Sequence, residues 1–267
     1  MDIKKRLIPC VIIVVATLGC VLLGRFTRVL FFLALAVVSA YELQNVLFEA
    51  GMPTSKCLMI AYIVLQAMLC WCRASAAWMV ALFGAAAFAA MFWGILKPER
   101  GTRFVSANLF ALLWPFGFFA VILHAAASKA WLPVLTLAVL GTWACDSMAL
   151  VGGKYFGKTK LAPTVSPHKT WEGAIVGGAS AIVAGMLMSW ILGRAIGVGF
   201  FGCVLTAFVA SCFGQIGDLA ASLVKRTAGV KDYGHLMPEH GGIMDKMDSM
   251  LFAIPAAYFL LYILGAI

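Results

Sequence analysis

Residues 222–248, SLVKRTAGVKDYGHLMPEHGGIMDKMD, form the most polar stretch of the sequence and separate two long apolar segments. Asp218 lies just upstream of this stretch. An ionised side chain inside a bilayer costs about 2.5–3.5 kcal/mol on insertion scales, so charges gathered beside apolar segments are seldom incidental. The stretch therefore marks the part of the chain where function is expected.

The composition places the chain among polytopic membrane proteins. Of 267 residues, 63% are hydrophobic and only 12% are charged, and a soluble domain could not cover that much apolar surface. The apolar segments follow one another without a long polar linker, which predicts a single integral-membrane domain over residues 1–267. We expect an all-α fold surrounded by the lipid bilayer, and no nucleic-acid partner.

Nine apolar windows approach the length of about 20 residues that a helix needs to cross a bilayer. The first follows a basic head and lacks an A-x-A-like cleavage site, so we expect a retained helix rather than a removed signal peptide. The third is the shortest. The windows are residues 7–24, 29–48, 57–72, 76–96, 104–123, 131–150, 171–192, 197–221 and 248–267.

The basic residues sort unevenly between the two sides of this nine-helix arrangement. Cytoplasmic loops carry an excess of Lys and Arg, and of the 20 Lys and Arg all but five fall on the side of the N-terminus. The pattern predicts a multi-pass protein of the cell membrane with a cytosolic N-terminus, an external C-terminus and cytosolic loops at 151–170 and 222–247. The five on the other side are Arg25, Arg28, Arg73, Lys129 and Arg194.

The acidic residues gather in the second half of the chain, where seven of the 11 Asp and Glu lie between positions 146 and 248. We therefore expect residues 1–130 to be mainly scaffold helices and residues 131–267 to hold the catalytic helices and loops. Glu42, in the second apolar window, is the exception. An intramembrane carboxylate is expected to face the bundle interior, and both a structural pairing and a functional role are open for it.

The carboxylates near the polar stretch form a candidate metal site. Asp245 and Asp248 are three residues apart and would share a face of a helix that begins there, while Asp218 closes the preceding apolar window. Three carboxylates in one membrane-level pocket would repel one another, and a hard divalent cation such as Mg²⁺ would relieve that repulsion. Solvated helix ends are the plainer alternative; we favour the metal.

Cations follow these acids at helical spacing. Lys225 and Arg226 come seven and eight positions after Asp218, so a continued helix carries them two turns further on, and Lys231 adds a third cation. Interleaved cations and acids suit a metal–polyphosphate substrate, in which Lys or Arg neutralises the charge that develops during transfer. A basic patch for anionic lipid head groups is the simpler alternative, but it leaves the interleaved Asp residues unexplained.

A turn is expected before the last helix at His240, Gly241 and Gly242, with His240 as a metal ligand, a phosphate donor or a cap. Upstream, the sequence from Gly152 to Thr159 satisfies the pattern G-x-x-x-x-G-K-[ST]. A P-loop follows a β-strand and opens a helix, whereas this segment follows an apolar window and leads into LAPTVSP. A P-loop ATPase fold is not expected, although the amides and lysines of this loop remain candidates for phosphate binding.

The polar stretch resembles the signature of the phosphatidate cytidylyltransferases, also called CDP-diglyceride synthetases. Lys246 stands where that family usually has arginine, and Met237 and Leu150 also depart from its pattern. The matching residues are Ser222-x-x-Lys225-Arg226, Lys231-Asp232-x-Gly234 and Pro238-x-His240-Gly241-Gly242-x-x-Asp245-x-x-Asp248, and upstream Asp146-Ser147-x-Ala149, Gly152, Gly157 and Ser166-Pro167-x-Lys169-Thr170-x-Glu172-Gly173.

The resemblance implies a multi-span, homodimeric membrane enzyme that converts CTP and phosphatidate to CDP-diacylglycerol and pyrophosphate with Mg²⁺. It implies metal carboxylates at Asp218, Asp245 and Asp248, with Asp146 as a fourth candidate and a second cation left open. It implies catalytic or phosphate-binding roles for Lys225, Arg226, Lys231 and Lys169, and substrate contacts at Ser166, Asp232, His240, Gly241 and Gly242.

Two other functions are compatible with parts of the sequence. A cation- or proton-coupled transporter would also bury carboxylates, but near the middle of its spans, whereas most of these acids lie at predicted cytosolic helix ends. A related lipid kinase or nucleotidyltransferase would share the phosphate chemistry. The placement of the acids beside basic loops favours nucleotide chemistry.

Overall fold

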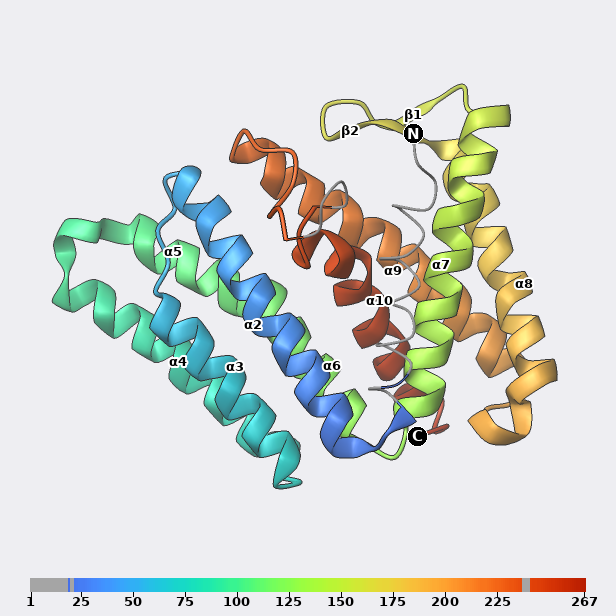
Figure 1. The fold of residues 1–267 in the computed structure, drawn as a ribbon, viewed down its shortest axis with the longest axis horizontal. Helices are drawn as coiled ribbons and strands as arrows, with labels where there is room; N and C mark the ends of the chain where they lie inside the picture. Colours follow the sequence, from blue (N-terminus) through green and yellow to red (C-terminus); the bar gives the residue numbers. More distant parts are fainter. Residues whose placement is uncertain (1–18, 20–21, 237–240) are drawn as a thin grey trace.

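The computed structural model describes residues 19, 22–236 and 241–267, and the chain there is almost entirely helical (Figure 1). The first half holds α2 (Arg25–Glu49), α3 (Lys56–Trp71), α4 (Ala76–Leu96), η1 (Pro98–Arg100), α5 (Gly101–Ala111), η2 (Leu112–Phe116) and α6 (Gly117–Ala127). The second half holds α7 (Trp131–Phe156), β1 (Lys160–Ala162), β2 (Ser166–Thr170), α8 (Trp171–Ile196), α9 (Phe200–Thr227) and α10 (Met244–Ile263).

The helices form two groups joined through the middle of the molecule. In Figure 1, α3, α4 and α5 lie on one side and α7 and α8 on the other. Helices α7, α8 and α9 pack on one another, α10 packs along α9, and α2 and α6 connect the first group to α10. The catalytic half expected from the sequence is therefore a compact helix cluster, against which the first half is packed.

The all-α, polytopic membrane architecture is confirmed. Within the described residues, seven helices are long and apolar enough to cross a bilayer. The count of nine is not reproduced, because α3 has only 16 residues and most of window 7–24 lies outside the described residues. The sides on which the two termini lie stay predictions.

Two helix boundaries differ from the apolar windows in a way that matters for the site. Helix α9 continues to Thr227, six residues beyond the window that ended at 221, and α10 begins at Met244, four residues before the window that began at 248. Apolar windows end where charge begins, but the hydrogen-bonded helix continues into the polar region. As a result Lys225, Arg226, Asp245 and Asp248 all stand on helices.

The loop between α7 and α8 contains a short antiparallel hairpin that the sequence did not predict. Lys160 pairs with Thr170, and Ala162 with Ser166. Thr170 then caps α8, its side chain accepting the backbone N–H of Gly173 at 3.2 Å. The hairpin holds β2 beside the end of the α7–α8–α9 cluster.

Glycines set the distances between helices in the second half. A Cβ on Gly177 would lie 2.8 Å from the backbone oxygen of Cys145, and one on Gly217 would lie 2.6 Å from that of Asp248. Neither space can hold a methyl group, so α8 meets α7, and α9 meets α10, backbone against backbone. The glycines of α8 and α9 thus permit this close approach.

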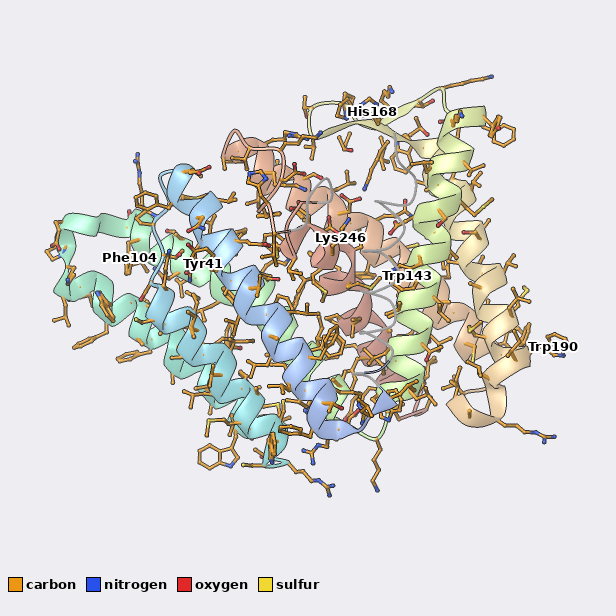
Figure 2. All side chains as sticks on the ribbon, viewed as in Figure 1. Tyr41, Phe104, Trp143, His168, Trp190 and Lys246 are labelled. Atoms are coloured by element: carbon orange, nitrogen blue, oxygen red, sulfur yellow. The ribbon has the colours of Figure 1, made fainter. Side chains whose placement is uncertain are left out.

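The outer surface of α8 is apolar. Trp190 is 85% exposed and points away from the bundle (Figure 2), and Ile175, Val183, Leu187 and Ile191 are also exposed. An exposed apolar face of this length is stable in hydrocarbon and not in water, which agrees with a membrane-spanning position for this helix.

Candidate active site

The site is built on one face of α9. Asp218, Ser222 and Lys225 stand at positions i, i+4 and i+7, so their side chains project from the same side of the helix. Ser222 donates its hydroxyl to Asp218 Oδ1 at 3.3 Å. On the other oxygen, Lys169 Nζ lies 2.5 Å from Asp218 Oδ2. The unpredicted hairpin therefore delivers Lys169, one of the expected phosphate binders, to the first of the expected metal carboxylates.

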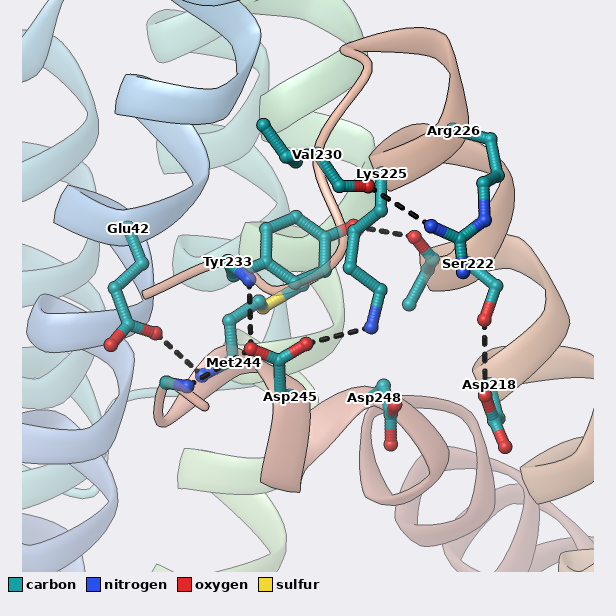
Figure 3. A network of polar contacts seen from close by, with 12 residues as sticks. Glu42, Asp218, Ser222, Lys225, Arg226, Val230, Tyr233, Met244, Asp245 and Asp248 are labelled. Atoms are coloured by element: carbon teal, nitrogen blue, oxygen red, sulfur yellow. Dashed lines mark hydrogen bonds and ion pairs between the residues drawn. The ribbon is translucent and has the colours of Figure 1, made fainter. Parts of the chain in front are cut away.

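Asp245 forms the most enclosed ion pair of the site (Figure 3). Its Oδ1 lies 2.7 Å from Lys225 Nζ, and the two side chains are only 8% and 10% exposed. Its Oδ2 accepts the backbone N–H of Tyr233 at 2.8 Å and of Gly242 at 2.9 Å. Both oxygens are thus satisfied, which compensates the desolvation of a buried charge pair. Asp245 fixes the position of Lys225 and of the loop before α10.

Tyr233 completes this buried cluster. Its hydroxyl donates to the backbone oxygen of Ala221 at 2.9 Å, and its ring lies 5.3 Å from Lys225 Nζ. Burial, together with the nearby charges of Asp245 and Asp248, raises the pKa of the Tyr233 phenol above its ordinary value. The phenol therefore stays protonated and serves as a hydrogen-bond donor that ties the loop to α9.

Glu42 reaches the same loop from the first half of the chain. Its carboxylate accepts the backbone N–H of Ile243 at 3.0 Å and of Met244 at 2.8 Å. These N–H groups lie at the start of α10, where a helix leaves its first donors unpaired and favours a negative charge. Of the two roles left open for this intramembrane carboxylate, the structure displays a capping role.

Glycines in the loop make room for Glu42. A Cβ on Gly234 would lie 2.6 Å, and one on Gly242 2.4 Å, from its carboxylate oxygens. Gly241 has φ +77°, which places it in the left-handed region that side-chain-bearing residues rarely adopt. The tight turn expected at Gly241 and Gly242 is therefore present, while His240 lies outside the described residues.

Asp248 lies on α10 near both Asp218 and Asp245 (Figure 3). The carboxylates of Asp248 and Asp218 are close enough to repel each other. Asp146 on α7 is likewise repelled by Asp218, but it is attracted by Lys169. Asp248 Oδ1 accepts the N–H of Ser249 at 2.6 Å. The expected acids thus gather on α7, α9 and α10, but Asp245 is turned toward Lys225.

The donors present suit a hard cation, although they do not form a closed metal cage. Among the residues that the structure describes, no group of three or more His, Cys, Asp or Glu side chains converges on one point. Asp146, Asp218 and Asp248 nevertheless offer only carboxylate oxygens, the ligands that Mg²⁺ prefers. Their mutual repulsion, offset on one side by Lys169, is what a divalent cation would relieve.

The other residues expected to contact substrate lie around these carboxylates and differ in their contacts and exposure. Arg226 is engaged with the backbone, donating from its Nε to Val165 O at 3.4 Å and from Nη1 to Val230 O at 3.2 Å. Its contacts join the end of α9 to the hairpin turn. Lys231 is exposed, Asp232 is half-buried in the loop, and Ser166 begins β2.

The loop with the P-loop-like pattern is occupied by Glu172. The backbone N–H groups of Lys158 and Thr159 donate to its carboxylate at 3.1 Å. Helix α7 precedes this loop, where a P-loop would follow a strand. The backbone N–H groups of these two residues are therefore hydrogen-bonded to Glu172 and are not available to bind a phosphate.

The sequence model of the Cytidylyltransferase family matches residues 4–264, nearly the whole chain. The chain belongs to this family. The described residues of the signature lie together in space: Ser222, Lys225 and Arg226 stand on α9, and Gly241 to Asp248 form the turn before α10 and its first residues (Figure 3).

Curated relatives carry one name. The chain is 44% identical over 125 residues to the phosphatidate cytidylyltransferase of Brucella abortus biovar 1, a match that covers 47% of this chain and 44% of the relative. It is 38% identical over 134 residues to that of Rickettsia felis, covering 49% and 58%, and 40% identical over 120 residues to that of Rickettsia typhi, covering 43% and 53%. The chain spans about half the length of the curated relatives it matches.

The contacts of two residues in this site were not predicted from the sequence of this cytidylyltransferase family member. Tyr233 carried no signal, because a tyrosine in a polar loop has no pattern of its own, and its backbone N–H is what contacts Asp245. Glu42 did carry a signal, since a carboxylate in an apolar window needs a partner, but the partner is the backbone of residues 243 and 244. No charge pattern predicts a backbone partner.

Proposed function

We propose that the protein transfers the cytidylyl group of CTP to phosphatidate and releases pyrophosphate, giving CDP-diacylglycerol. The proposal rests on the family, on the name shared by the relatives, and above all on one observation: the Asp218 carboxylate on α9 contacts Lys169, and the buried Lys225–Asp245 pair lies on the same side of the cluster. Acids on α7 and α10 are near enough to Asp218 to interact with it. Acids and cations interleaved at one membrane-level site suit a metal–polyphosphate substrate.

The reaction balances without a strong base. An oxygen of the phosphatidate phosphate attacks the α-phosphorus of CTP, a new P–O bond forms, and the bond to the bridging oxygen of the β-phosphate breaks so that pyrophosphate leaves with its electron pair. A phosphate monoester is largely ionised near neutral pH, since its second pKa is about 6, and already carries the nucleophilic oxygen. The protein therefore has to position the two phosphates and neutralise charge.

The lysines are suited to that work in different ways. Lys169 is 28% exposed on its side chain and reaches Asp218 from the hairpin, so it can exchange this carboxylate for a substrate phosphate. Lys225 is buried and paired with Asp245, so its ammonium group is held in a fixed position beside the site. Lys231, exposed in the loop, is a third phosphate-binding candidate.

Asp218, Asp248 and Asp146 are the residues proposed to hold Mg²⁺, and Asp245 Oδ1 is a further candidate ligand beside Lys225. These carboxylates would hold the cation, which would supply Lewis-acid neutralisation of the phosphate charge. Because carboxylate oxygens accept more than one interaction, Asp245 can contribute without releasing Tyr233 or Gly242. A second cation at the same carboxylates remains a prediction.

The setting of the enzyme is also proposed. The excess of Lys and Arg in the loops on one side supports a site on the cytosolic side of the cell membrane, where CTP would enter from water while phosphatidate stays anchored in the bilayer. The exposed apolar face of α8 suits lipid or a second copy of the chain, and a homodimer is the expected assembly.

Labelled CTP tests this reaction against a lipid kinase. With CTP labelled at the α-phosphorus, the label should appear in the lipid product; with CTP labelled at the γ-phosphorus, it should appear in pyrophosphate alone. Label from the γ-position in the lipid would indicate a lipid kinase. Label in neither product would contradict cytidylyl transfer.

A further inference from the structure

Four of the five basic residues that fell on the side opposite the predicted cytosolic loops line one pocket. The pocket has a volume of about 530 Å³ and is lined by Arg25, Arg28, Arg73 and Lys129 among others. They come from the start of α2, the α3–α4 turn and the α6–α7 connection. Most of the Lys and Arg residues predicted on the side opposite the cytosolic loops are thus gathered at one pocket.

This pocket is far from the carboxylates of the active site. Arg28 and Glu42 stand on the same straight helix, 14 residues apart, which at 1.5 Å per residue separates them by about 21 Å along its axis. Glu42 contacts the active-site loop. The pocket therefore lies at the opposite end of the bundle, near the other face of the membrane.

The arginines of the pocket are held in position by the fold. Arg28 is only 6% exposed; its guanidinium lies 4.0 Å from the centre of the Trp131 ring, and its Nε donates to Ala126 O at 3.0 Å. Arg25 donates to the oxygens of Cys70 and Trp71, while its buried Nε makes no hydrogen bond. A buried donor left without an acceptor is costly, and an incoming anion would supply one.

Arg73 occupies a backbone position that favours glycine. Its φ is +54°, and no other described residue except glycines has a positive φ. A left-handed conformation costs a side-chain-bearing residue about 1 kcal/mol or more. An arginine at such a position, facing the same pocket, is better explained by its charge than by its fit to the turn.

Among the described residues that line the pocket, none is an acid. Several cations around one cavity repel each other unless an anion lies among them. Guanidinium groups bind phosphate oxygens especially well, since their donors match the spacing of these oxygens. The electrostatics of the pocket therefore call for a phosphate-type anion.

A second, mostly apolar cavity adjoins the first. It has a volume of about 410 Å³ and shares Met79 and His124 with the cationic pocket. Its other walls include Phe83, Phe118, Val121 and Phe259. A cationic cavity beside an apolar one matches a molecule with an anionic head and a hydrocarbon tail.

We propose that these two adjoining cavities bind one anionic phospholipid from the leaflet opposite the active site, with its head-group phosphate at Arg25 and Arg73 and an acyl chain in the apolar cavity. Trp71 and Trp131 flank the basic residues of the pocket. Tryptophan favours the membrane–water interface, which agrees with a pocket at the level of the lipid head groups. A soluble phosphate-type anion has the same head-group chemistry but no use for the apolar cavity.

The test compares lipids of equal chain length on the delipidated, full-length protein in detergent, by native mass spectrometry and thermal unfolding. Phosphatidylglycerol should bind and raise Tm, while phosphatidylcholine and inorganic phosphate should do so at least about tenfold more weakly, as expected when charge or tail is missing. Equal effects from inorganic phosphate would overturn the lipid assignment, and equal effects from phosphatidylcholine would overturn the role of net charge.

The variant Arg73→Gly separates binding from folding. Glycine suits the left-handed backbone, so Tm without lipid should not fall, while the apparent affinity for phosphatidylglycerol should drop about tenfold and one bound lipid should be lost. Arg194→Gln is the matched control, because Arg194 belongs to the same charge minority but lies at the end of α8, away from the pocket. Unchanged lipid binding in Arg73→Gly, or an equal loss in Arg194→Gln, would overturn the proposal.

Discussion

The Glu42 carboxylate accepts the backbone N–H of Met244 at 2.8 Å, across 202 positions of sequence. A helix of the first half thereby caps the helix that carries Asp245 and Asp248. The first half is thus more than a membrane scaffold, because one of its side chains fixes the start of α10 and, through Gly234 and Gly242, the loop before it.

Replacing Glu42 by alanine should lower Tm and turnover together. The substitution removes a helix cap, worth about 0.5–2 kcal/mol, and leaves two buried N–H groups without an acceptor. Glu42→Gln keeps one oxygen acceptor and should lie between alanine and the native residue. Thermal unfolding in detergent and an activity assay give the two readouts.

The matched control for that prediction is Glu49→Gln, an exposed carboxylate on the same helix. It should change neither Tm nor turnover measurably. If Glu42→Ala behaved like Glu49→Gln, the contact between the two halves of the chain would not stabilise the site.

Lys225 and Asp245 should show strong energetic coupling. Removing one partner of a buried pair costs about 3–5 kcal/mol, because the other charge stays buried without compensation. Lys225→Met and Asp245→Asn should therefore each lower Tm, and the double variant should lose clearly less than the sum of the two. Additive losses in this double-mutant cycle would mean that the 2.7 Å contact contributes little.

Gly217→Ala should disturb the site by separating two helices. The new methyl group would lie 2.6 Å from the backbone oxygen of Asp248, so α9 and α10 must move apart, at a cost of about 1–3 kcal/mol. Turnover should fall, since Asp218 is the next residue along. Gly84→Ala, in α4 with no atom within 4 Å of the added carbon, should be neutral or stabilising.

Asp248→Asn tests the proposed Mg²⁺ ligands. The variant should need more Mg²⁺ for half-maximal rate and lose at least about 100-fold in turnover, because a bound cation contributes several kcal/mol to such a transition state. Glu99→Gln, an exposed acid on η1, should keep the native Mg²⁺ dependence. An unchanged Mg²⁺ requirement in Asp248→Asn would remove Asp248 from the ligand set.

Much of the architecture could be predicted because composition and apolar length report directly on the membrane. The helical, polytopic fold follows from them, and so does the placement of Asp218 and Lys225 on one helix, which depends only on helical spacing. Boundaries were harder to predict. Hydropathy changes at residue 221, but the backbone of α9 continues in a helix to Thr227, since hydrogen bonding does not stop where charge begins.

The interior of the site was less predictable, because its decisive contacts involve the backbone. Asp245 looked like a metal ligand from its charge and spacing, yet it contacts Lys225 and two backbone N–H groups. Lys169 reaches Asp218 only because a hairpin forms between α7 and α8. Such partners depend on tertiary geometry that no periodicity in the sequence encodes.

The most direct test of the central claim is the reaction itself, measured with purified full-length protein, phosphatidate, CTP and Mg²⁺, with lipid product and pyrophosphate quantified together. We predict CDP-diacylglycerol and pyrophosphate in equal amounts, no reaction when Mg²⁺ is chelated, and at least native activity in Lys246→Arg, which restores the residue usual in the family. If no cytidylylated lipid forms beside an active control enzyme, while vesicles containing the protein show coupled ion flux, the assignment as a cytidylyltransferase is contradicted and a transporter takes its place.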